Sequence, residues 1–232
     1  MTDSNKVIKS DIKTLLTLSC FGKIGPRGFA KLVAENITLR NLTTSRFVKA
    51  GIKENIASEW SQFIDQFDVD YELERLNSLG VQLITQGDEN YPPMLKEISD
   101  PPFLLYSKGN IQCLHRQTLA VVGSRKHTHY GSQIIETLVP SLAMGGVVVV
   151  SGLAYGIDAL AHRATLKSGQ QTAAIVACGL DRIYPSDHIS LGEEIINKNG
   201  VIISEYALGT PPLKQHFPAR NRIIAGVSSG TL

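Results

Sequence analysis

A short segment near the end of the chain places several cationic side chains around one aromatic ring. Lys214, Phe217, Arg220, Asn221 and Arg222 follow one another closely there. Lysine and arginine bind phosphate oxygens, and an aromatic ring can stack on any base because every base has a π-face. Contacts of this kind provide affinity without reading the base sequence. The segment therefore predicts a nucleic-acid ligand.

A second group with anion-binding chemistry is the tripeptide Gly123-Ser124-Arg125. It follows an apolar run that is typical of a buried strand. Small residues let backbone N–H groups approach an anion, and the arginine fork can bind two phosphate oxygens at once. We expect this turn to contact phosphate.

A third candidate is the turn SGLAYGID at residues 151–158, which also follows an apolar run and opens a helix. The positive end of a helix favours an anion, so Ser151, Gly152, Gly156 and Asp158 are further, weaker phosphate-site candidates. For Asp158 itself, a loop-bracing or helix-capping role is favoured over that of a catalytic acid.

Elements that alternate along the second half of the chain must position these groups. Apolar runs predict strands at 119–122, 147–150, 173–177 and 201–204, and helices are expected at 130–144, 158–167, 193–199 and 221–225. This alternation predicts a Rossmann-like α/β fold with a doubly wound parallel sheet. Ligands of such sheets bind at the carboxyl ends of the strands, where all three groups are expected to meet.

The rest of the chain divides into two predicted regions. Residues 1–70 are expected to form a small helical domain, with a helix-hairpin-helix turn at Ile24-Gly25-Pro26. Residues 71–110 are expected to be a connector with a helix at 71–79, a strand at 81–85 and an edge strand at 103–106. Residues 111–232 would then be the Rossmann-like domain. In this fold a further strand should follow the last helix, but the sequence contains no apolar run for it. The sheet is therefore predicted to be incomplete and the chain to be a fragment.

Composition limits the function in a simple way. The 232 residues are 43% hydrophobic and 19% charged, and the net charge is only +2. A nucleic-acid site must therefore be a local patch rather than a property of the whole chain. The apolar run 147–150 is far too short to span a bilayer, and three scattered cysteines are typical of a reducing cytosol. We expect a cytoplasmic protein.

Four motifs together resemble the DprA/Smf family, the DNA-processing protein of bacterial natural transformation. They are VVGSR at 121–125, SGLAYGIDALAH at 151–162, GLDRIYP at 179–185 and SEY…PLKQHFPARNRIIAG at 204–226. The resemblance covers residues 71–232 strongly, and it implies a SAM-like helical domain before them. It also implies a homodimer that binds single-stranded DNA, protects incoming strands and loads RecA recombinase, with no cofactor and no enzymatic activity.

The resemblance also implies roles for individual residues. Gly123, Ser124 and Arg125 match its phosphate-binding turn. Lys214 and Phe217 match the basic and aromatic positions of its DNA groove, and the segment from Arg220 to Arg222 completes the basic rim.

Two other functions are weighed against this one. A nucleotide phosphoribohydrolase would need a P-G-G-x-G-T turn, which the chain lacks, and Glu205 is its one plausible catalytic carboxylate. Because Arg220 and Arg222 are close in sequence, an ion pair is the favoured role of Glu205. A nucleotide-sensing module could seat a mononucleotide phosphate at residues 152–158. The chain has no G-x-G-x-x-G fingerprint, no Walker A motif and no metal-ligand cluster.

Overall fold

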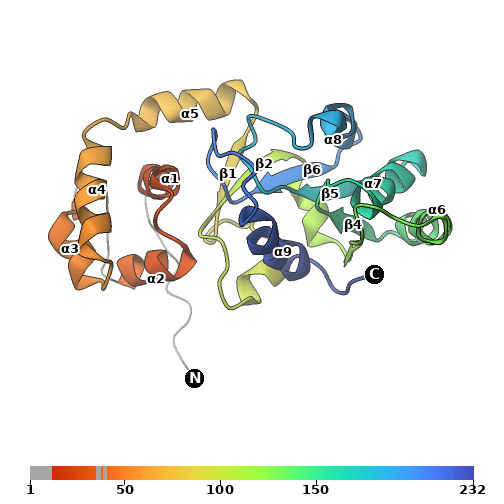
Figure 1. Cartoon of the computed structure of the whole chain (residues 1–232), viewed down its shortest axis with the longest axis horizontal. Helices are drawn as coiled ribbons and strands as arrows, with labels where there is room; N and C mark the ends of the chain where they lie inside the picture. The colour runs from red at the N-terminus through yellow and green to blue at the C-terminus, as the bar shows by residue number, and fades with distance from the viewer. Residues whose placement is uncertain (1–11, 35–37, 39–40) are drawn as a thin grey trace.

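The first part of the chain is helical, as the computed structural model shows (Figure 1). The structure describes residues 12–34, 38 and 41–232, and the sequence-based expectations for 1–11, 35–37 and 39–40 lie outside the described residues. The helices are α1 (Ile12–Phe21), α2 (Pro26–Ala34), α3 (Thr44–Lys49), α4 (Glu54–Ile64) and α5 (Val69–Ser78). The predicted pair of helices around the Gly25 turn is α1 and α2, and α2 begins earlier than the apolar pattern suggested. Trp60 is buried among these helices, and its indole nitrogen donates to the carbonyl of Leu42 at 2.9 Å.

Six strands form one mixed sheet in the second part of the chain. They are β1 (Gln82–Thr85), β2 (Leu104–Gly109), β3 (Thr118–Ala120), β4 (Val148–Ser151), β5 (Thr172–Ile175) and β6 (Val201–Ser204). Their order is β1-β2-β6-β5-β4-β3. The strands from β3 to β6 are parallel, whereas β1 and β2 join antiparallel beside β6. The predicted α/β class is confirmed.

Residues 103–106 were expected to form an extra strand at the edge of the next domain; the strand is present, but it is not the outermost one. This strand, β2, pairs with β1 on one side and with β6 on the other. Its residues Leu104, Leu105 and Tyr106 are all buried, because both faces and both edges of the strand are covered. The sheet therefore extends beyond its parallel part into the connector.

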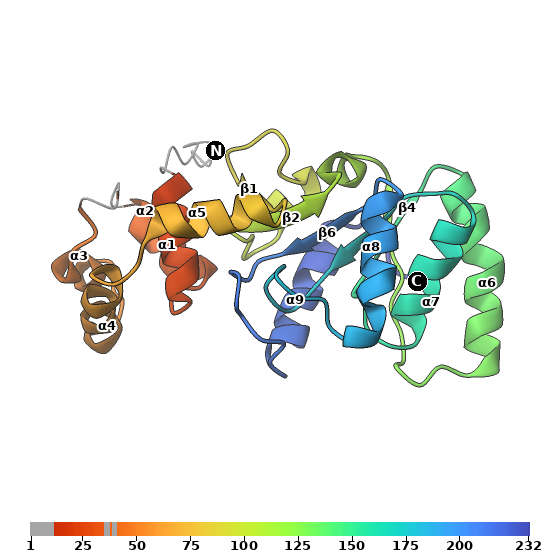
Figure 2. The same ribbon diagram turned by 90° about the horizontal axis from the view of Figure 1, so that it is seen from above.

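Helices cover both faces of the sheet (Figure 2). On one face lie α6 (His129–Met144), α7 (Ile157–Lys167) and α8 (Ile189–Asn197). The other face is covered by α9 (His216–Gly226) and by the 3₁₀ helices η2 (Pro93–Glu97) and η3 (Ile111–His115); a further 3₁₀ turn, η4 (Ser186–His188), precedes α8. Strand residues alternate between the two cores, as Val149 and Val150 illustrate.

The end of the chain returns to the sheet, where no further strand was expected. Thr231 forms a parallel bridge with Ala120. The amide of Ala120 donates to the carbonyl of Gly230 at 2.9 Å, and the amide of Leu232 donates to the carbonyl of Ala120 at 2.8 Å. The last residues of the chain therefore lie beside β3 and extend the hydrogen bonding of the sheet by one bridge. Because the chain crosses from β6 back to this edge, the strand order reverses between β3 and residues 229–232, which is the switch point of the sheet.

Candidate nucleic-acid interface

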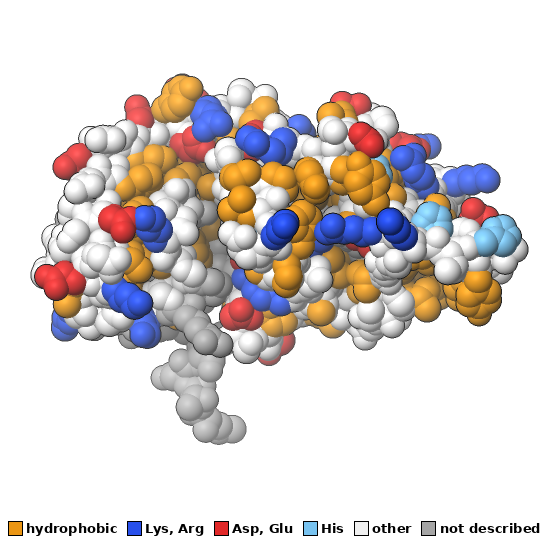
Figure 3. Space-filling model, in the orientation of Figure 1, with side chains coloured by type: hydrophobic (Ala, Val, Ile, Leu, Met, Phe, Trp, Pro, Cys, Tyr) orange, Lys and Arg blue, Asp and Glu red, His pale blue; other side chains and the backbone are white. Residues whose placement is uncertain are grey.

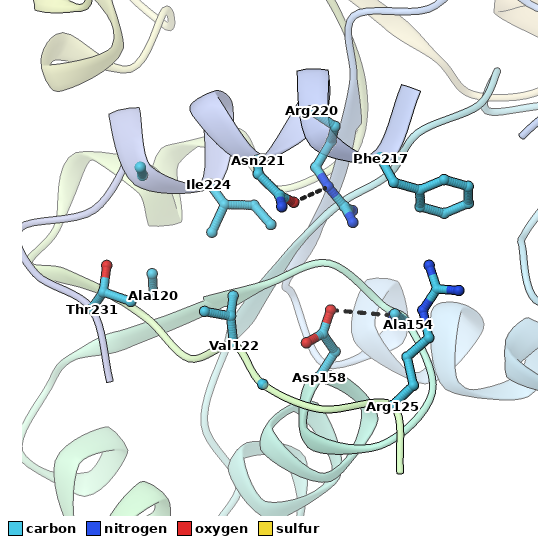
Figure 4. Close-up of a pocket in the computed structure, with 12 residues that line it drawn as sticks. Ala120, Val122, Arg125, Ala154, Asp158, Phe217, Arg220, Asn221, Ile224 and Thr231 are labelled. Atoms are coloured by element: carbon cyan, nitrogen blue, oxygen red, sulfur yellow. Dashed lines mark hydrogen bonds between the residues drawn. The ribbon is translucent and has the colours of Figure 1, made fainter. Parts of the chain in front are cut away.

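A cavity of about 250 Å³ opens at the switch point, next to the carboxyl end of β3 (Figure 4). The loop after β3, the start of α7 and one face of α9 line it. Doubly wound sheets bind ligands at this place because the loops on either side diverge there. This cavity is therefore the place at which the three predicted phosphate-binding groups are expected to meet.

The loop Gly123-Ser124-Arg125 presents its arginine to solvent. A Cβ atom on Gly123 would lie 2.6 Å from the Ile157 side chain, so the close contact with α7 requires glycine. The Ser124 hydroxyl is used within the loop, since it accepts from the amide of Lys126 at 3.1 Å and contacts its carbonyl. Arg125 is exposed and has no ion pair with any residue that the structure describes. It is therefore the member of this tripeptide whose side chain can reach a phosphate.

The loop at 151–158 is braced by Asp158, as expected. Its carboxylate accepts the amides of Gly152 at 3.1 Å and Ala154 at 3.4 Å. The carboxylate is buried, and burial raises its pKa, although the charge of Arg220 opposes this shift. The amides that could bind a phosphate at this turn thus already have a partner inside the protein.

Ser151 and Gly156 also serve the loop itself. The Ser151 hydroxyl is buried and donates to the carbonyl of Val121 at 2.6 Å, which ties β4 to the chain after β3. Gly156 has a φ of +80°, and a Cβ atom there would lie 2.1 Å from the Ser124 carbonyl oxygen. Gly156 thus allows the Arg125 loop to pack against the start of α7, and neither Ser151 nor Gly156 lines the cavity.

Arg220 faces the cavity but is only 4% exposed. Its guanidinium donates to the carbonyl of Gly152 at 2.9 Å, to the carbonyl of Ile175 and to the Asn221 side chain at 3.2 Å. Burial lowers its pKa, although the Asp158 charge opposes the shift. This arginine fastens α9 to the carboxyl ends of β4 and β5, so the structure does not place it on a basic rim. Asn221, its neighbour, is exposed at the mouth of the cavity.

Arg222 lies on another side of α9. It forms ion pairs with Glu205 and with Asp100, the latter at 3.1 Å. Burial raises the pKa of Glu205, and the Arg222 charge opposes this shift. The predicted ion pair of Glu205 is confirmed for Arg222 and not for Arg220. Arg222 does not line the switch-point cavity, so the structure separates it from Arg125.

Lys214 and Phe217 lie at the start of α9. Lys214 is exposed in the turn before the helix and has no ion pair in the described part of the chain. The Phe217 ring is half-buried, and the Arg125 guanidinium lies 5.2 Å from its centroid. Figure 4 shows Arg125 extending from the opposite wall towards this ring. The structure thus brings Arg125 and Phe217 together, and Lys214 precedes Phe217 by three residues. Figure 3 shows cations beside hydrophobic side chains on the side of the molecule that faces the viewer in Figure 1.

Two aromatic residues beside Phe217 are absent from the predicted site. Tyr184 lies 5.9 Å from Phe217 between ring centroids, and Tyr155 lines the same small cavity. Both follow the carboxyl end of a parallel strand. This position in the sequence could have assigned them to the edge of the sheet where ligands bind. No helix in the described ranges is long and apolar enough to cross a membrane, and no three potential metal ligands cluster there.

The fold and the site define a doubly wound α/β protein with a basic and aromatic switch-point edge. A sequence profile described as DNA recombination-mediator protein A matches residues 82–232, and the chain belongs to this family. It is 42% identical to Protein Smf of Escherichia coli K12 over 150 residues, which are 65% of the chain and 40% of that protein. It is 45% identical to DNA processing protein DprA of Streptococcus pneumoniae R6 over 145 residues, 62% of the chain and 51% of that protein. The matched regions thus span about half or less of these relatives.

Solved structures of DNA processing protein A are similar to the chain. The X-ray structure from Streptococcus pneumoniae superposes with a TM-score of 0.79 at 33% identity, covering 96% of this chain and 77% of that one. The Helicobacter pylori protein, whose structural study concerns its single-stranded DNA binding mode, gives a TM-score of 0.58 at 36% identity. That match covers 65% of this chain and 67% of the other. The predicted family is confirmed.

Proposed function

We propose that this chain binds single-stranded DNA along the carboxyl edge of its parallel strands. The observation that carries the proposal is the contact of Arg125 with Phe217 across the switch-point cavity, with the exposed Lys214 three residues before Phe217 in the turn that precedes α9. Both cations are exposed and have no carboxylate partner among the described residues, so phosphate oxygens can bind them. The Helicobacter pylori relative, studied for its single-stranded DNA binding mode, supports the same ligand.

The biological role we propose follows the family. The chain would act as a recombination mediator that protects incoming single strands, loads RecA and works as a homodimer in the cytoplasm, without catalysis or a cofactor. Family membership supports this role. The nucleotide-sensing alternative has less support, because Asp158 already binds the amides of Gly152 and Ala154 that would hold a phosphate.

Binding of a labelled oligodeoxythymidine as a function of salt tests the proposal. Affinity should fall steeply with salt, since each neutralised phosphate of a single strand contributes about 0.7 to the slope of log K against log salt. Arg125→Ala and Lys214→Ala should each weaken binding and lower that slope by about 0.7, as expected for one lost phosphate contact.

Lys198→Ala is the matched control. Lys198 is an exposed lysine after α8, at the amino end of β6 and therefore at the opposite edge of the sheet. Its removal should leave the slope unchanged. Equal slopes for wild type and for both site variants, or equal affinity for duplex and single strand, would contradict the proposed site.

A further inference from the structure

The aromatic surface of the candidate interface is larger than Phe217 alone. Tyr184 follows β5 and is 45% exposed, and Tyr155 follows β4 and is 43% exposed. Both line a cavity of about 80 Å³ that also contacts Phe217 and Arg125. Solvent-exposed aromatic rings beside unpaired cations are the arrangement that single-strand-binding proteins use to stack bases.

Phe217 has limited free surface for this purpose. The Arg125 guanidinium lies 5.2 Å from its centroid, and the Tyr184 ring lies 5.9 Å away with a 57° tilt between the planes. Rings at such a distance are in direct contact, so no base fits between them. The half-buried Phe217 therefore shares the contact surface with Tyr184, which is the more exposed of the two rings.

The surroundings of Tyr184 are suited to a base and not to a phosphate. Several of the residues that line the cavity are small and uncharged, among them Ala154, Ala177 and Cys178. Burial raises the pKa of the Cys178 thiol to about 11, so it is neutral at pH 7. Arg125 is the one charged residue that lines the cavity. Phosphates can reach Arg125, and the exposed Lys214 outside the cavity, while bases occupy the apolar side.

Tyr155 and Asp187 also favour a base over a phosphate on the apolar side of the cavity. The Tyr155 hydroxyl donates to the Asp187 carboxylate at 3.0 Å, and its ring packs edge-on against His188 at 5.1 Å. These contacts fix Tyr155 as a wall of the cavity. The carboxylate charge of Asp187 disfavours a phosphate at this end, because like charges repel.

We propose that Tyr184 is a second base-stacking residue, which receives the base adjacent to the one at Phe217. The inference rests on the proposed single-stranded DNA binding. Since the two rings are tilted by 57°, the two bases would lie on differently oriented surfaces and would not stack on each other. The strand would therefore bend at this point, which a stiff, fully stacked duplex would not do.

The first test is the affinity of three variants for oligodeoxythymidine. Tyr184→Ala should weaken binding roughly five- to 150-fold, the range expected for one lost base–aromatic stack. Tyr184→Phe keeps the ring and should stay within about twofold of wild type. Tyr71→Ala is the control, because Tyr71 is also exposed, at 61%, but lies on α5 away from the site. Its affinity should not change.

The second test separates stacking from phosphate contacts. An oligomer of the same length with abasic sites keeps every phosphate, so Tyr184→Ala should bind it as wild type does, whereas Arg125→Ala should bind it more weakly. Photocrosslinking with 5-iododeoxyuridine should yield an adduct on the peptide that contains Tyr184. Wild-type affinity of Tyr184→Ala for oligodeoxythymidine, or equal losses on both oligomers, would overturn the role of Tyr184. Failure of the proposed function would look different, because wild type itself would not bind.

Discussion

His162 is a fully buried imidazole behind the 151–158 loop. Its Nδ1 lies 2.8 Å from the Thr172 hydroxyl, and that hydroxyl donates to the carbonyl of Val149. The hydroxyl must therefore accept from Nδ1–H, which assigns the neutral tautomer. Nε2 has no partner in the described structure, so a proton there would be a buried, unpaired charge. Burial accordingly lowers the pKa of His162 to about 3.

Acid should therefore destabilise the protein through His162. Its folded pKa of about 3 lies below the ordinary value of 6.5, so the unfolded chain binds the proton first. The contribution of His162 to the free energy of unfolding is fully present above pH 6.5 and is lost as the pH falls from there towards 3. Between pH 7.5 and 5.5 the expected loss in free energy of unfolding from this group is about 1 kcal/mol. Urea denaturation at both pH values measures it.

His162→Asn tests whether this residue is responsible. Asparagine can keep a hydrogen bond to Thr172 but does not titrate, so the pH-dependent loss should be smaller by about 1 kcal/mol. The absolute stability of the variant does not affect the comparison, because each protein is compared with itself. An equal pH-dependent loss in both proteins would assign the acid sensitivity to other groups.

The three arginines of the candidate site show what sequence reasoning can predict at this scale. Residue type and spacing placed all three near phosphate, but only Arg125 is exposed. Arg220 is buried and donates hydrogen bonds to backbone carbonyl groups, and Arg222 forms an ion pair with Glu205. The missing information was where α9 begins. From its start at His216, residues 217, 220, 221 and 224 fall on one helical face and 222 does not.

Among the elements, the turn between β4 and α7 holds the Arg125 loop. The amide of Ile157 donates to the Ser124 carbonyl at 3.2 Å. Gly156 makes this approach possible, because it has a φ of +80° and a Cβ atom would lie 2.1 Å from the Ser124 oxygen. The position of Arg125 thus depends on a glycine in a neighbouring element.

Gly156→Ala should reduce both stability and DNA affinity, because the added methyl group displaces the Ser124 carbonyl and with it the Arg125 loop. The matched control is Gly169→Ala after α7, which has a similar φ of +76° but nothing within 4 Å of the added Cβ. The control should lose about 1 kcal/mol of stability from backbone strain alone and keep its affinity. Thermal unfolding and oligodeoxythymidine binding measure the two effects. Equal stability losses and unchanged affinity in both variants would show that the contact is unimportant.

The parallel strands were predictable because each is a short apolar run before a glycine-containing turn. Strand β6 has the predicted bounds, and the bounds of β3, β4 and β5 shift by a few residues. The place of β2 inside the sheet was not predictable, since strand order is set by tertiary packing and not by local pattern. The return of residues 229–232 to β3 was not predictable either, because it too depends on tertiary packing.

At the scale of the whole molecule, the helical part and the sheet share one core. A single cluster of buried apolar residues runs from α1 and α4 to β2 and β6. Phe29 of α2 stacks on Phe103 with ring centroids 4.1 Å apart, and the Tyr106 hydroxyl donates to the Ser19 hydroxyl at 2.8 Å. The predicted division at residue 70 follows a change of sequence pattern, which cannot show that the two parts are joined by buried contacts.

This shared core predicts that the two parts unfold together. Trp60 is the one tryptophan of the chain and is buried among the N-terminal helices, so its fluorescence reports on that part. In urea, the fluorescence transition should coincide with the loss of circular dichroism. Phe103→Ala should lower stability by about 3 kcal/mol and make the Trp60 transition precede the circular dichroism transition, because it removes the stack on Phe29. Phe103→Leu, which keeps most of the apolar volume, should leave the transitions coincident. Coincident transitions in Phe103→Ala would show that other contacts couple the two parts.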